Sequence, residues 1–299
     1  MNDSAPHNIH RSRTDGGIVI WKPSGMTSRH ALAELERRLQ IAGFGHTGTL
    51  DPLATGILVA LCGEARKFQN LLMGHVKEYV ARIRLGVVST TDDNDGMLAC
   101  WQPRRALPTL AELASELVAL TGRQQQVPPA ISAIWVNGER AHSLTRRGAE
   151  PELPAREVEI ERIELLRYAG PQLTIKIRCG PGTYVRALAR DLGARLGCGA
   201  YLTSLRRTVS AGFVETDAVP LALVEPRHLL TMEALLAPYP RRELAPQQLD
   251  AFRHGQSVLI GTGEPRHDGQ LVAWCEGRVA GVVEERGDQL VSVRWLRTN

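Results

Sequence analysis

The segment at 43–56, GFGHTGTLDPLATG, combines the residue types of a ligand-binding or catalytic loop. Its glycines let the backbone approach a bulky ligand closely. His46 adds a titratable ring, two threonines add hydroxyls, and Asp51 adds a carboxylate, all within six residues. A lone carboxylate suits covalent catalysis, whereas most glycoside hydrolases use two. A structural interpretation is also open, because Asp51 followed by Pro52 is the pattern of a helix N-cap before a proline.

A second group of candidate residues lies at 180–190, GPGTYVRALAR, and continues in LRR at 205–207. Planar guanidinium cations suit phosphates or a carboxylate, and this group supplies Arg186, Arg190, Arg206 and Arg207. Tyr184 offers a flat ring on which a nucleic-acid base could stack. Tyr79 is a third candidate, although tyrosine is common in strands. A solvated helix face would give the same arginine pattern, so both interpretations remain open.

The composition limits the class of protein. The 299 residues are 43% hydrophobic and 23% charged, which is ordinary for a globular chain. A net charge of +4 is compatible with a nucleic-acid partner and equally with many small-molecule enzymes. The five cysteines form no C-x-x-C pair, which predicts a reduced, cytoplasmic setting without disulfides. No apolar segment is long enough for a signal peptide or a bilayer span, which predicts a soluble protein without membrane contact.

Several kinds of site find no support in the sequence. The nine histidines are scattered without metal-ligand spacing, so no metal site is expected. Neither a P-loop nor a G-x-S-x-G nucleophile elbow is present.

Apolar periodicity predicts the elements that must position these residues. Strands are predicted at 17–21, 57–62, 78–85, 131–136, 158–168 and 173–179. Helices are predicted at 64–72, 110–120, 140–147 and 184–196, and another helix should begin after Thr27 or Ser28 as its N-cap. The strand predicted after Gly56 argues against Asp51 as a helix N-cap.

A change in composition near 237–242 predicts a domain boundary. Residues 1–16 are polar and lack periodicity, which indicates a disordered tail. A short helix at 246–252 and brief strands at 257–260, 271–275, 279–283 and 289–295 indicate a small β-barrel or sandwich.

These segments together closely resemble the bacterial tRNA pseudouridine synthases of the TruB family, which modify uridine 55 in the T-loop. The most specific match is GHTGTLDPLATG at 45–56. The others occur in the family's order: KPSGMTS at 22–28, KEY at 77–79, TDD at 91–93, QVPP at 126–129 through VNG at 136–138, GTYVR at 182–186 and LRR at 205–207. The matches cover most of residues 17–213.

The resemblance implies an α+β fold. A catalytic domain at 17–240 would contain a central mixed, mainly antiparallel β-sheet flanked by helices and loops. A small PUA-like, RNA-binding β-barrel would follow at 244–299. The sequence departs from the family pattern at Ile131, Ile134-Trp135 and His142, which concern contacts with the tRNA arm rather than the chemistry.

The resemblance also implies the catalytic group. Asp51 aligns with the family's nucleophilic aspartate and Arg186 with the arginine that pairs with it, and a nearby cation favours an ionised carboxylate. The reaction breaks the N1–C1′ bond, rotates the uracil and rejoins it through C5. It needs no redox change, hydrolysis or energy input, so no cofactor or metal is implied. Attack of Asp51 at C1′, assistance of proton loss at C2′, and attack at C6 all remain open.

Five further residues are implied to contact the substrate RNA. Tyr79 aligns with a tyrosine that stacks on the flipped uracil, and Tyr184 and Leu205 align with residues that contact the target base. His46 aligns with a histidine that enters the T-loop, and Lys22 with a lysine near the active-site floor. The implied partner is the T-arm of tRNA. No membrane and no obligate protein partner are expected, and the chain is expected to act as a monomer.

Three other functions remain as alternatives. A non-catalytic RNA-binding or RNA-folding protein would share the basic helix and the terminal barrel but would not require Asp51. The same chemistry on another RNA, such as rRNA, would leave every catalytic residue unchanged. An unrelated small-molecule glycosyl enzyme is disfavoured by the missing second carboxylate and the arginine clusters.

Overall fold

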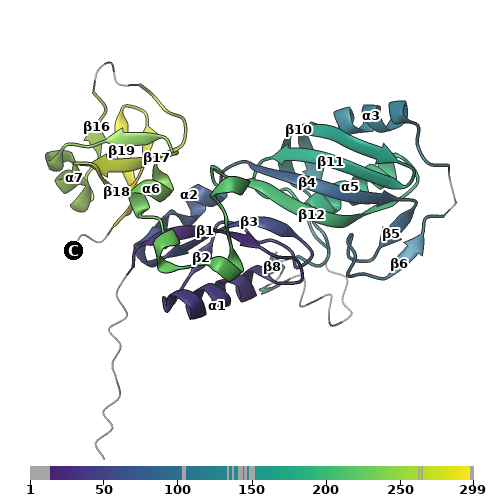
Figure 1. Ribbon diagram of the computed structural model, residues 1–299. Helices are drawn as coiled ribbons and strands as arrows, with labels where there is room; N and C mark the ends of the chain where they lie inside the picture. The colour runs from purple at the N-terminus through teal and green to yellow at the C-terminus, as the bar shows by residue number, and fades with distance from the viewer. Residues whose placement is uncertain are drawn as a thin grey trace, which may run out of the picture.

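A computed structural model describes residues 14–102, 106–132, 135–136, 138–140, 144, 147, 152–261, 263 and 265–296. Within them the chain forms a large mixed sheet flanked by helices, followed by a smaller sheet near the C-terminus (Figure 1). This arrangement confirms the predicted α+β class. Residues 1–13 of the tail predicted at 1–16 lie outside the described residues, as do most of the helix predicted at 140–147, Ile134 and His142. The last residue of the predicted tail, Gly16, is instead the first residue of a strand.

The large sheet has ten strands among the described residues, and most of its pairings are antiparallel. Its main path runs β14 (Val219–Pro220), β1 (Gly16–Lys22), β3 (Thr55–Cys62), β12 (Ala200–Ser210), β4 (Lys77–Leu85), β11 (Gln172–Cys179), β10 (Arg156–Ala169) and β7 (Gly122–Gln126). Off this path, β2 (Gly45–His46) pairs with β3 and β13 (Phe213–Val214) pairs with β12. Parallel pairing joins only β1 to β14 and β12 to β3 within this sheet as described.

The strand β12 was missed by the sequence interpretation, although it joins the two halves of the sheet. It runs parallel to β3 on one side and antiparallel to β4 on the other. Both faces of much of this strand are buried, so apolar and polar residues do not alternate clearly. The pair Arg206-Arg207 looked like a basic surface segment, but Arg207 is 1% exposed.

Three helices cover one face of the large sheet and share its main core: α1 (Ser28–Leu39), α3 (Leu110–Ala119) and α5 (Val185–Arg195). The hydroxyl of Thr27 caps α1 by accepting a hydrogen bond from the His30 amide. Of the two predicted N-cap residues, Thr27 and Ser28, the structure has Thr27. A capping box between Thr109 and Glu112 begins α3. The predicted starts of these helices are therefore confirmed to within a residue or two.

Two predicted elements differ from the structure. The segment predicted as one helix at 64–72 is a 3₁₀ turn, η1 (Gly63–Phe68), followed by a short α2 (Gln69–Met73). Of the strand predicted at 131–136, Ile131 and Ser132 lie in a bend instead, while Trp135–Val136 form β8, which pairs with β9 (Glu139–Arg140). Another small hairpin joins β5 (Val87–Ser89) to β6 (Leu98–Cys100).

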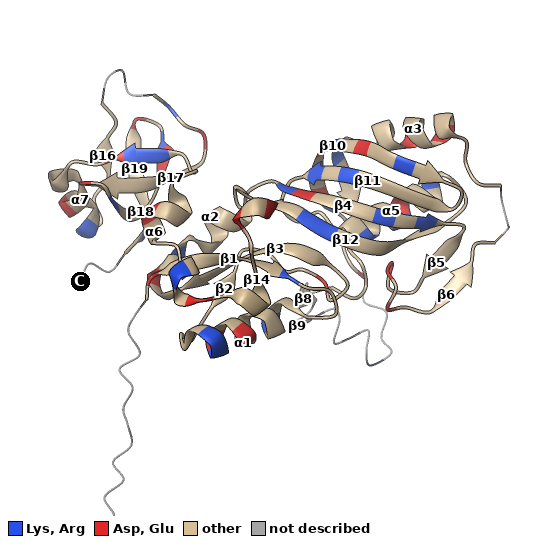
Figure 2. Ribbon diagram, in the orientation of Figure 1, with Lys and Arg blue, Asp and Glu red and all other residues tan. Residues whose placement is uncertain are grey.

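The C-terminal unit contains a curled, five-stranded sheet with α7 (Pro246–Arg253) beside it. Its order is β15 (Arg241–Glu243), β17 (Gln270–Cys275), β18 (Arg278–Arg286), β19 (Gln289–Trp295) and β16 (Val258–Leu259). The connection to it contains η2 (Glu215–Asp217), η3 (Leu221–Leu223), η4 (Pro226–His228) and α6 (Met232–Leu236). One apolar cluster joins this unit to the large sheet, because Val272 and Val282 pack with Val59 and Leu61 of β3. The charged residues of both units are shown in Figure 2.

Candidate active site

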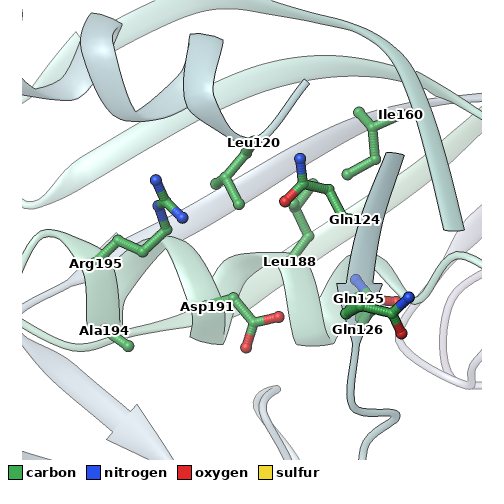
Figure 3. A pocket seen from close by; sticks show the side chains of 9 residues that line it. All are labelled: Leu120, Gln124, Gln125, Gln126, Ile160, Leu188, Asp191, Ala194 and Arg195. Carbon is green, nitrogen blue, oxygen red and sulfur yellow. The ribbon is translucent and has the colours of Figure 1, made fainter. Parts of the chain in front are cut away.

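A cavity of about 260 Å³ lies between α3, β7 and α5 (Figure 3). Its polar lining residues are Gln124, Gln125, Gln126, Asp191 and Arg195. Burial raises the pKa of Asp191, and the neighbouring Arg190 opposes that shift. None of the predicted site residues lines this cavity, so it is separate from the group around Asp51.

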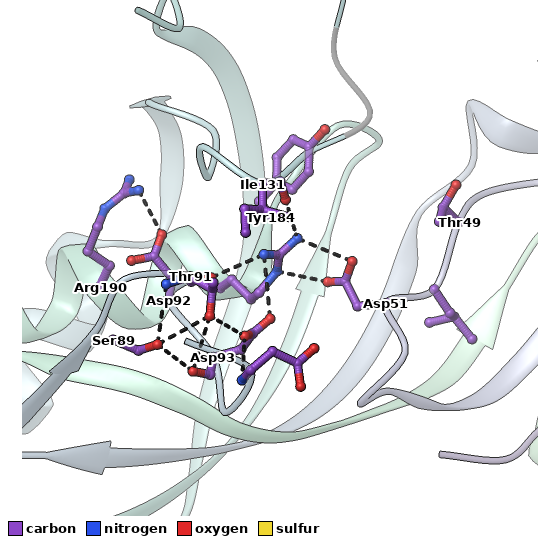
Figure 4. Close-up of polar contacts among 12 residues, drawn as sticks. Thr49, Asp51, Ser89, Thr91, Asp92, Asp93, Ile131, Tyr184 and Arg190 are labelled. Atoms are coloured by element: carbon purple, nitrogen blue, oxygen red, sulfur yellow. Dashed lines mark hydrogen bonds and ion pairs between the residues drawn. The ribbon is translucent and has the colours of Figure 1, made fainter. Parts of the chain in front are cut away.

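The carboxylate of Asp51 is held by Arg186 in a two-point contact (Figure 4). Arg186 Nε donates to Asp51 Oδ2 at 2.9 Å, and Nη2 donates to Oδ1 at 3.2 Å. The Asp51 side chain is 31% exposed, while that of Arg186 is 5% exposed. No helix follows Asp51, since residues 52–53 form a turn and β3 begins at Thr55. Asp51 is therefore not a helix N-cap, and its carboxylate is accessible from solvent beside a buried cation.

Besides the Asp51 loop, groups from two other segments fix the guanidinium of Arg186. It lies in the first turn of α5 and donates to the backbone oxygen of Thr91 at 3.1 Å and of Ile131 at 2.9 Å. The carboxylate of Asp93 lies 3.5 Å from Nη1. Together with the two bonds to Asp51, these contacts use all three guanidinium nitrogens, so the two donors that face Asp51 have one orientation.

Asp93 is a second carboxylate at this site, and the sequence interpretation missed its role. It is 3% exposed and accepts hydrogen bonds from Thr91 Oγ1 at 2.5 Å and from the Asp95 amide at 3.0 Å. The isolated bridge of Asp93 to Leu202 of β12 anchors the acidic turn against the sheet. The TDD sequence at 91–93 indicated a turn, but nothing in it showed that this turn contacts Arg186. Asp93 lies at Nη1 of the guanidinium, while Asp51 is bound by Nε and Nη2.

Arg190 lies four residues after Arg186 in α5 and binds the same acidic segment, 91–93. Its Nη1 donates to Asp92 Oδ2 at 3.0 Å, and its Nη2 donates to the backbone oxygen of Val127 at 2.7 Å. Burial raises the pKa of Asp92, while the cations of Arg190 and Arg186 oppose this shift. Arg190 is thus engaged with a carboxylate rather than free to bind a phosphate.

Lys22 links the Asp51 loop to the segment that follows β1. Its side chain is fully buried, and Nζ donates to the backbone oxygens of Pro23 at 2.8 Å, Met26 at 2.6 Å and Pro52 at 3.5 Å. Burial lowers the pKa of Lys22 to about 8, with Asp51 raising it and Arg207 lowering it further. The lysine therefore holds two chain segments together next to Asp51.

Arg207 holds the other side of the loop. Its Nε donates to the backbone oxygen of Ile57 at 2.8 Å and Nη2 to that of Gly48 at 3.0 Å. The loop can approach this strand only because residue 56 is glycine. Gly56 has φ +113°, and a Cβ there would lie 2.3 Å from the backbone oxygen of Arg207. Arg207 positions the Asp51 loop, and the interpretation of its side chain as a phosphate ligand is wrong.

Tyr79 and Leu205 lie on the two central strands beside this loop. Tyr79 of β4 is paired with Arg207 of β12, and Leu205 is paired with Ala81 of β4. Both side chains are buried in the main core, at 7% and 6% exposure. Burial raises the pKa of Tyr79, with Arg207 opposing, so the phenol stays neutral at physiological pH.

The two remaining predicted residues flank the same region. Tyr184 is the N-cap residue of α5, and its backbone exchanges two hydrogen bonds with the Gln126 amide, at 2.8 and 3.2 Å. His46 lies in β2, and the Gly48 amide donates to its Nδ1 at 3.3 Å. Burial, reinforced by the Arg207 cation, lowers the pKa of His46, so its ring is neutral near pH 7.

Comparisons with known proteins agree with this architecture. A model described as the TruB family pseudouridylate synthase N-terminal domain matches residues 36–185, and one described as the tRNA pseudouridylate synthase B C-terminal domain matches 186–249. Curated relatives named tRNA pseudouridine synthase B include one from Azoarcus sp. strain BH72, 38% identical over 97% of both chains. Another, from Xylella fastidiosa, is 43% identical over 84% of this chain and 85% of its own.

Solved structures share the fold at lower identity. A protein of a Cbf5-Nop10-Gar1 complex superimposes with a TM-score of 0.71, at 21% identity over 94% of this chain and 84% of its own. A chain of an H/ACA ribonucleoprotein bound to a substrate RNA containing 2′-deoxyuridine gives 0.69, at 19% identity over 95% and 85%.

The family models and the curated relatives show that this fold is that of a pseudouridine synthase, a class of isomerases. Within that class the chain belongs to the TruB family. None of the helices in the described part of the chain has the length and apolar composition to cross a bilayer.

Proposed function

We propose that this protein converts uridine 55 in the T-loop of tRNA to pseudouridine, with Asp51 as the nucleophile. The contact that carries this proposal is the two-point bond between Asp51 and Arg186. It holds a solvent-accessible carboxylate in a fixed direction beside the buried guanidinium of Arg186. The names of the curated relatives support tRNA as the substrate.

The reaction rearranges one nucleotide without a net change in atoms. The N1–C1′ bond breaks, the uracil rotates, a C5–C1′ bond forms, C5 loses its proton and N1 gains one. Asp51 acts at the sugar, as nucleophile at C1′ or by assisting proton loss at C2′, or it adds to C6 of the base. Each route needs one carboxylate held in a fixed orientation at the reacting nucleotide, and the contact with Arg186 supplies that orientation.

The target base must leave the stacked loop before it reaches Asp51, at a cost of a few kcal/mol. Stacking on an aromatic ring contributes about 1–3 kcal/mol and offsets part of this cost. We assign that stacking to Tyr79, the contacts with the target base to Tyr184 and Leu205, and insertion into the T-loop to the neutral His46. Lys22 supports the floor of the site through its carbonyl contacts.

The proposal extends to the working form of the enzyme. The C-terminal unit acts as a PUA-like RNA-binding domain, with the domain division at 240–244. The chain acts in the cytoplasm as a monomer, without a cofactor or an obligate protein partner. Sedimentation of the purified chain with and without tRNA tests whether it is a monomer. Turnover by the purified chain alone tests whether it needs a cofactor or a protein partner.

A single-turnover assay on an unmodified T-arm hairpin tests the function and the nucleophile together. Wild-type protein should form pseudouridine at position 55 only, and Asp51→Asn should form none while binding the hairpin with near-wild-type affinity. Asp268→Asn, at an exposed site of the C-terminal unit, is the matched control and should react normally. Near-normal turnover by Asp51→Asn would overturn the nucleophile assignment.

Mapping of pseudouridine in total RNA from cells with and without the gene tests the substrate. A site lost from tRNA position 55 supports the proposal. Loss of a site in rRNA alone would assign the same chemistry to another substrate. RNA binding without any pseudouridine formation would favour the non-catalytic alternative.

A further inference from the structure

The second face of the large sheet carries a basic surface that the proposed chemistry does not use. Side chains of β4 alternate, so Tyr79, Ala81 and Ile83 point into the main core while Arg82 and Arg84 point the other way. No helix among the described residues covers this face over β4, β11 and β10, whereas α3 and α5 lie behind it (Figures 1 and 2). The face is therefore open, and it lies on the opposite side of the sheet from α5 and its Asp51–Arg186 pair.

The strand register arranges cations and hydroxyls in a row across this face. Arg82 is paired with Ser204 of β12 on one side and with Thr174 of β11 on the other, and Thr174 is paired with Arg167 of β10. Adjacent strands lie about 4.8 Å apart, so the two arginines are based about 10 Å apart with a hydroxyl between them. A flat row of this kind matches a chain of phosphates better than a single small anion.

The charges on this face are only partly neutralised. Its cations are Arg82, Arg84, Arg162, Arg167, Lys176, Arg178 and Arg206. Four have carboxylate partners at the surface: Arg162 with Glu164 at 3.4 Å, Lys176 with Glu78 at 3.0 Å, Arg178 with Glu161 at 2.7 Å and Arg206 with Glu215 at 3.3 Å. Arg82, Arg84 and Arg167 form no ion pair with any residue in the described part of the chain. Three guanidinium groups thus remain available to an external anion.

The position of the C-terminal unit extends this surface. Its strands β17 and β18 pack on β3 through the apolar cluster on the second face, which is the face that carries Arg82. The C-terminal unit therefore lies on the same side of the sheet as Arg82.

We infer that this open face, defined by Arg82, Arg84, Arg167, Thr174 and Ser204, is a second RNA-binding surface that takes the phosphate backbone outside the target loop. Guanidinium groups bind phosphate oxygens bidentately, and hydroxyls add single hydrogen bonds. None of these five residues is aromatic, and Tyr201, which is paired with Arg84 on the same face, is only 5% exposed and cannot stack on a base. The binding is therefore independent of sequence and sensitive to salt. The inference rests on the proposed function only in taking RNA as the partner.

The double variant Arg82→Gln/Arg84→Gln tests the surface with a short RNA duplex that lacks a T-loop and any target uridine. Binding is measured over a range of salt concentrations for wild type, for this variant and for Arg82→Lys/Arg84→Lys. Removing two phosphate contacts should lower the slope of log Kd against log salt by about 1.8, at about 0.9 for each phosphate. At low salt the affinity of the glutamine variant for the duplex should be about tenfold or more below that of wild type. The lysine variant should keep most of the affinity and most of the salt slope.

Turnover separates this surface from the catalytic site. The glutamine variant should convert an isolated T-arm hairpin at a rate within twofold of wild type, with an unchanged circular dichroism spectrum. Equal duplex affinity and salt slope in wild type and the glutamine variant would overturn the inference, as would a parallel loss of hairpin turnover. Failure of the proposed function has a different signature, because wild-type protein would then form no pseudouridine at all.

Discussion

Arg186 and Asp51 are 135 residues apart in the chain, yet their guanidinium and carboxylate groups form two hydrogen bonds, of 2.9 and 3.2 Å. The guanidinium is also bound to backbone oxygens of Thr91 and Ile131. The orientation of the Asp51 carboxylate therefore depends on an arginine that the rest of the protein holds in place, and the flanking residues can be tested one at a time.

Arg186→Lys should reduce the single-turnover rate while RNA binding changes little. Lysine keeps the charge but is a point cation that cannot make the two-point contact or reach both carbonyl groups. A displacement of about 1 Å at a reacting group costs about 10²-fold in rate. Quench-flow measurement on a T-arm hairpin gives the rate, and filter binding gives the affinity. A rate within threefold of wild type would show that charge alone is sufficient.

Asp93→Asn should slow the reaction by about tenfold or more. The substitution keeps the shape but removes the negative charge that lies 3.5 Å from Arg186 Nη1. A hydrogen bond to a charged group contributes about 1.5–3 kcal/mol, and about 1.4 kcal/mol corresponds to a factor of ten in rate. Asp95→Asn, at an exposed position of the same turn, is the control and should react normally. Equal rates for the two variants would exclude a role of Asp93 in orienting Arg186.

Tyr79→Phe should bind RNA normally but turn over more slowly. Phenylalanine retains the ring for stacking and removes only the hydroxyl, which lies in the electrostatic field of Arg207 and Asp51. Single-turnover rates and binding constants for the same hairpin distinguish the two effects. A loss of binding with a changed melting temperature would instead assign Tyr79 a structural role.

Lys22→Met should change the pH dependence of stability above pH 8. The pKa of folded Lys22 is about 8 and that of the unfolded side chain is 10.5, so the unfolded chain binds more protons between these values. The Lys22 contribution to the free energy of unfolding therefore rises with pH in this window, by about 1–2 kcal/mol between pH 8 and 10. Urea unfolding of both proteins measures it. A difference between wild type and variant that is constant over this range would contradict the assignment.

Gly56→Ala should destabilise the fold by about 2–4 kcal/mol. The added Cβ would lie 2.3 Å from a backbone oxygen of Arg207 at a φ of +113°, and neither strand can move without breaking the sheet. Gly170→Ala is the matched control, because its φ is +59° but no atom lies within 4 Å of the added Cβ. That control should cost about 1 kcal/mol, the cost of a left-handed backbone for alanine. Equal losses in urea unfolding would show that the close approach at Gly56 is unimportant.

Local sequence predicted those parts of the fold whose pattern is set by one buried face. The apolar run 57–62 and the alternating residues 78–85 are strands as expected, the cap of α1 is one of the two predicted residues, and α3 begins at the predicted residue. The pattern failed where burial is not one-sided. In β12 polar and apolar residues are buried together, so a central strand resembled a basic surface segment.

The sequence by itself determined the family, the α+β class and the identity of Asp51 as the candidate nucleophile, because these depend on residue types in order along the chain. Only the tertiary structure decided what each cation does. Arg186 meets a carboxylate, Arg207 and Lys22 meet backbone oxygens, and Arg82 faces solvent. The side chain of a charged residue does not specify its partner; the partner is set by strand register and chain crossings that bring distant segments within hydrogen-bonding distance.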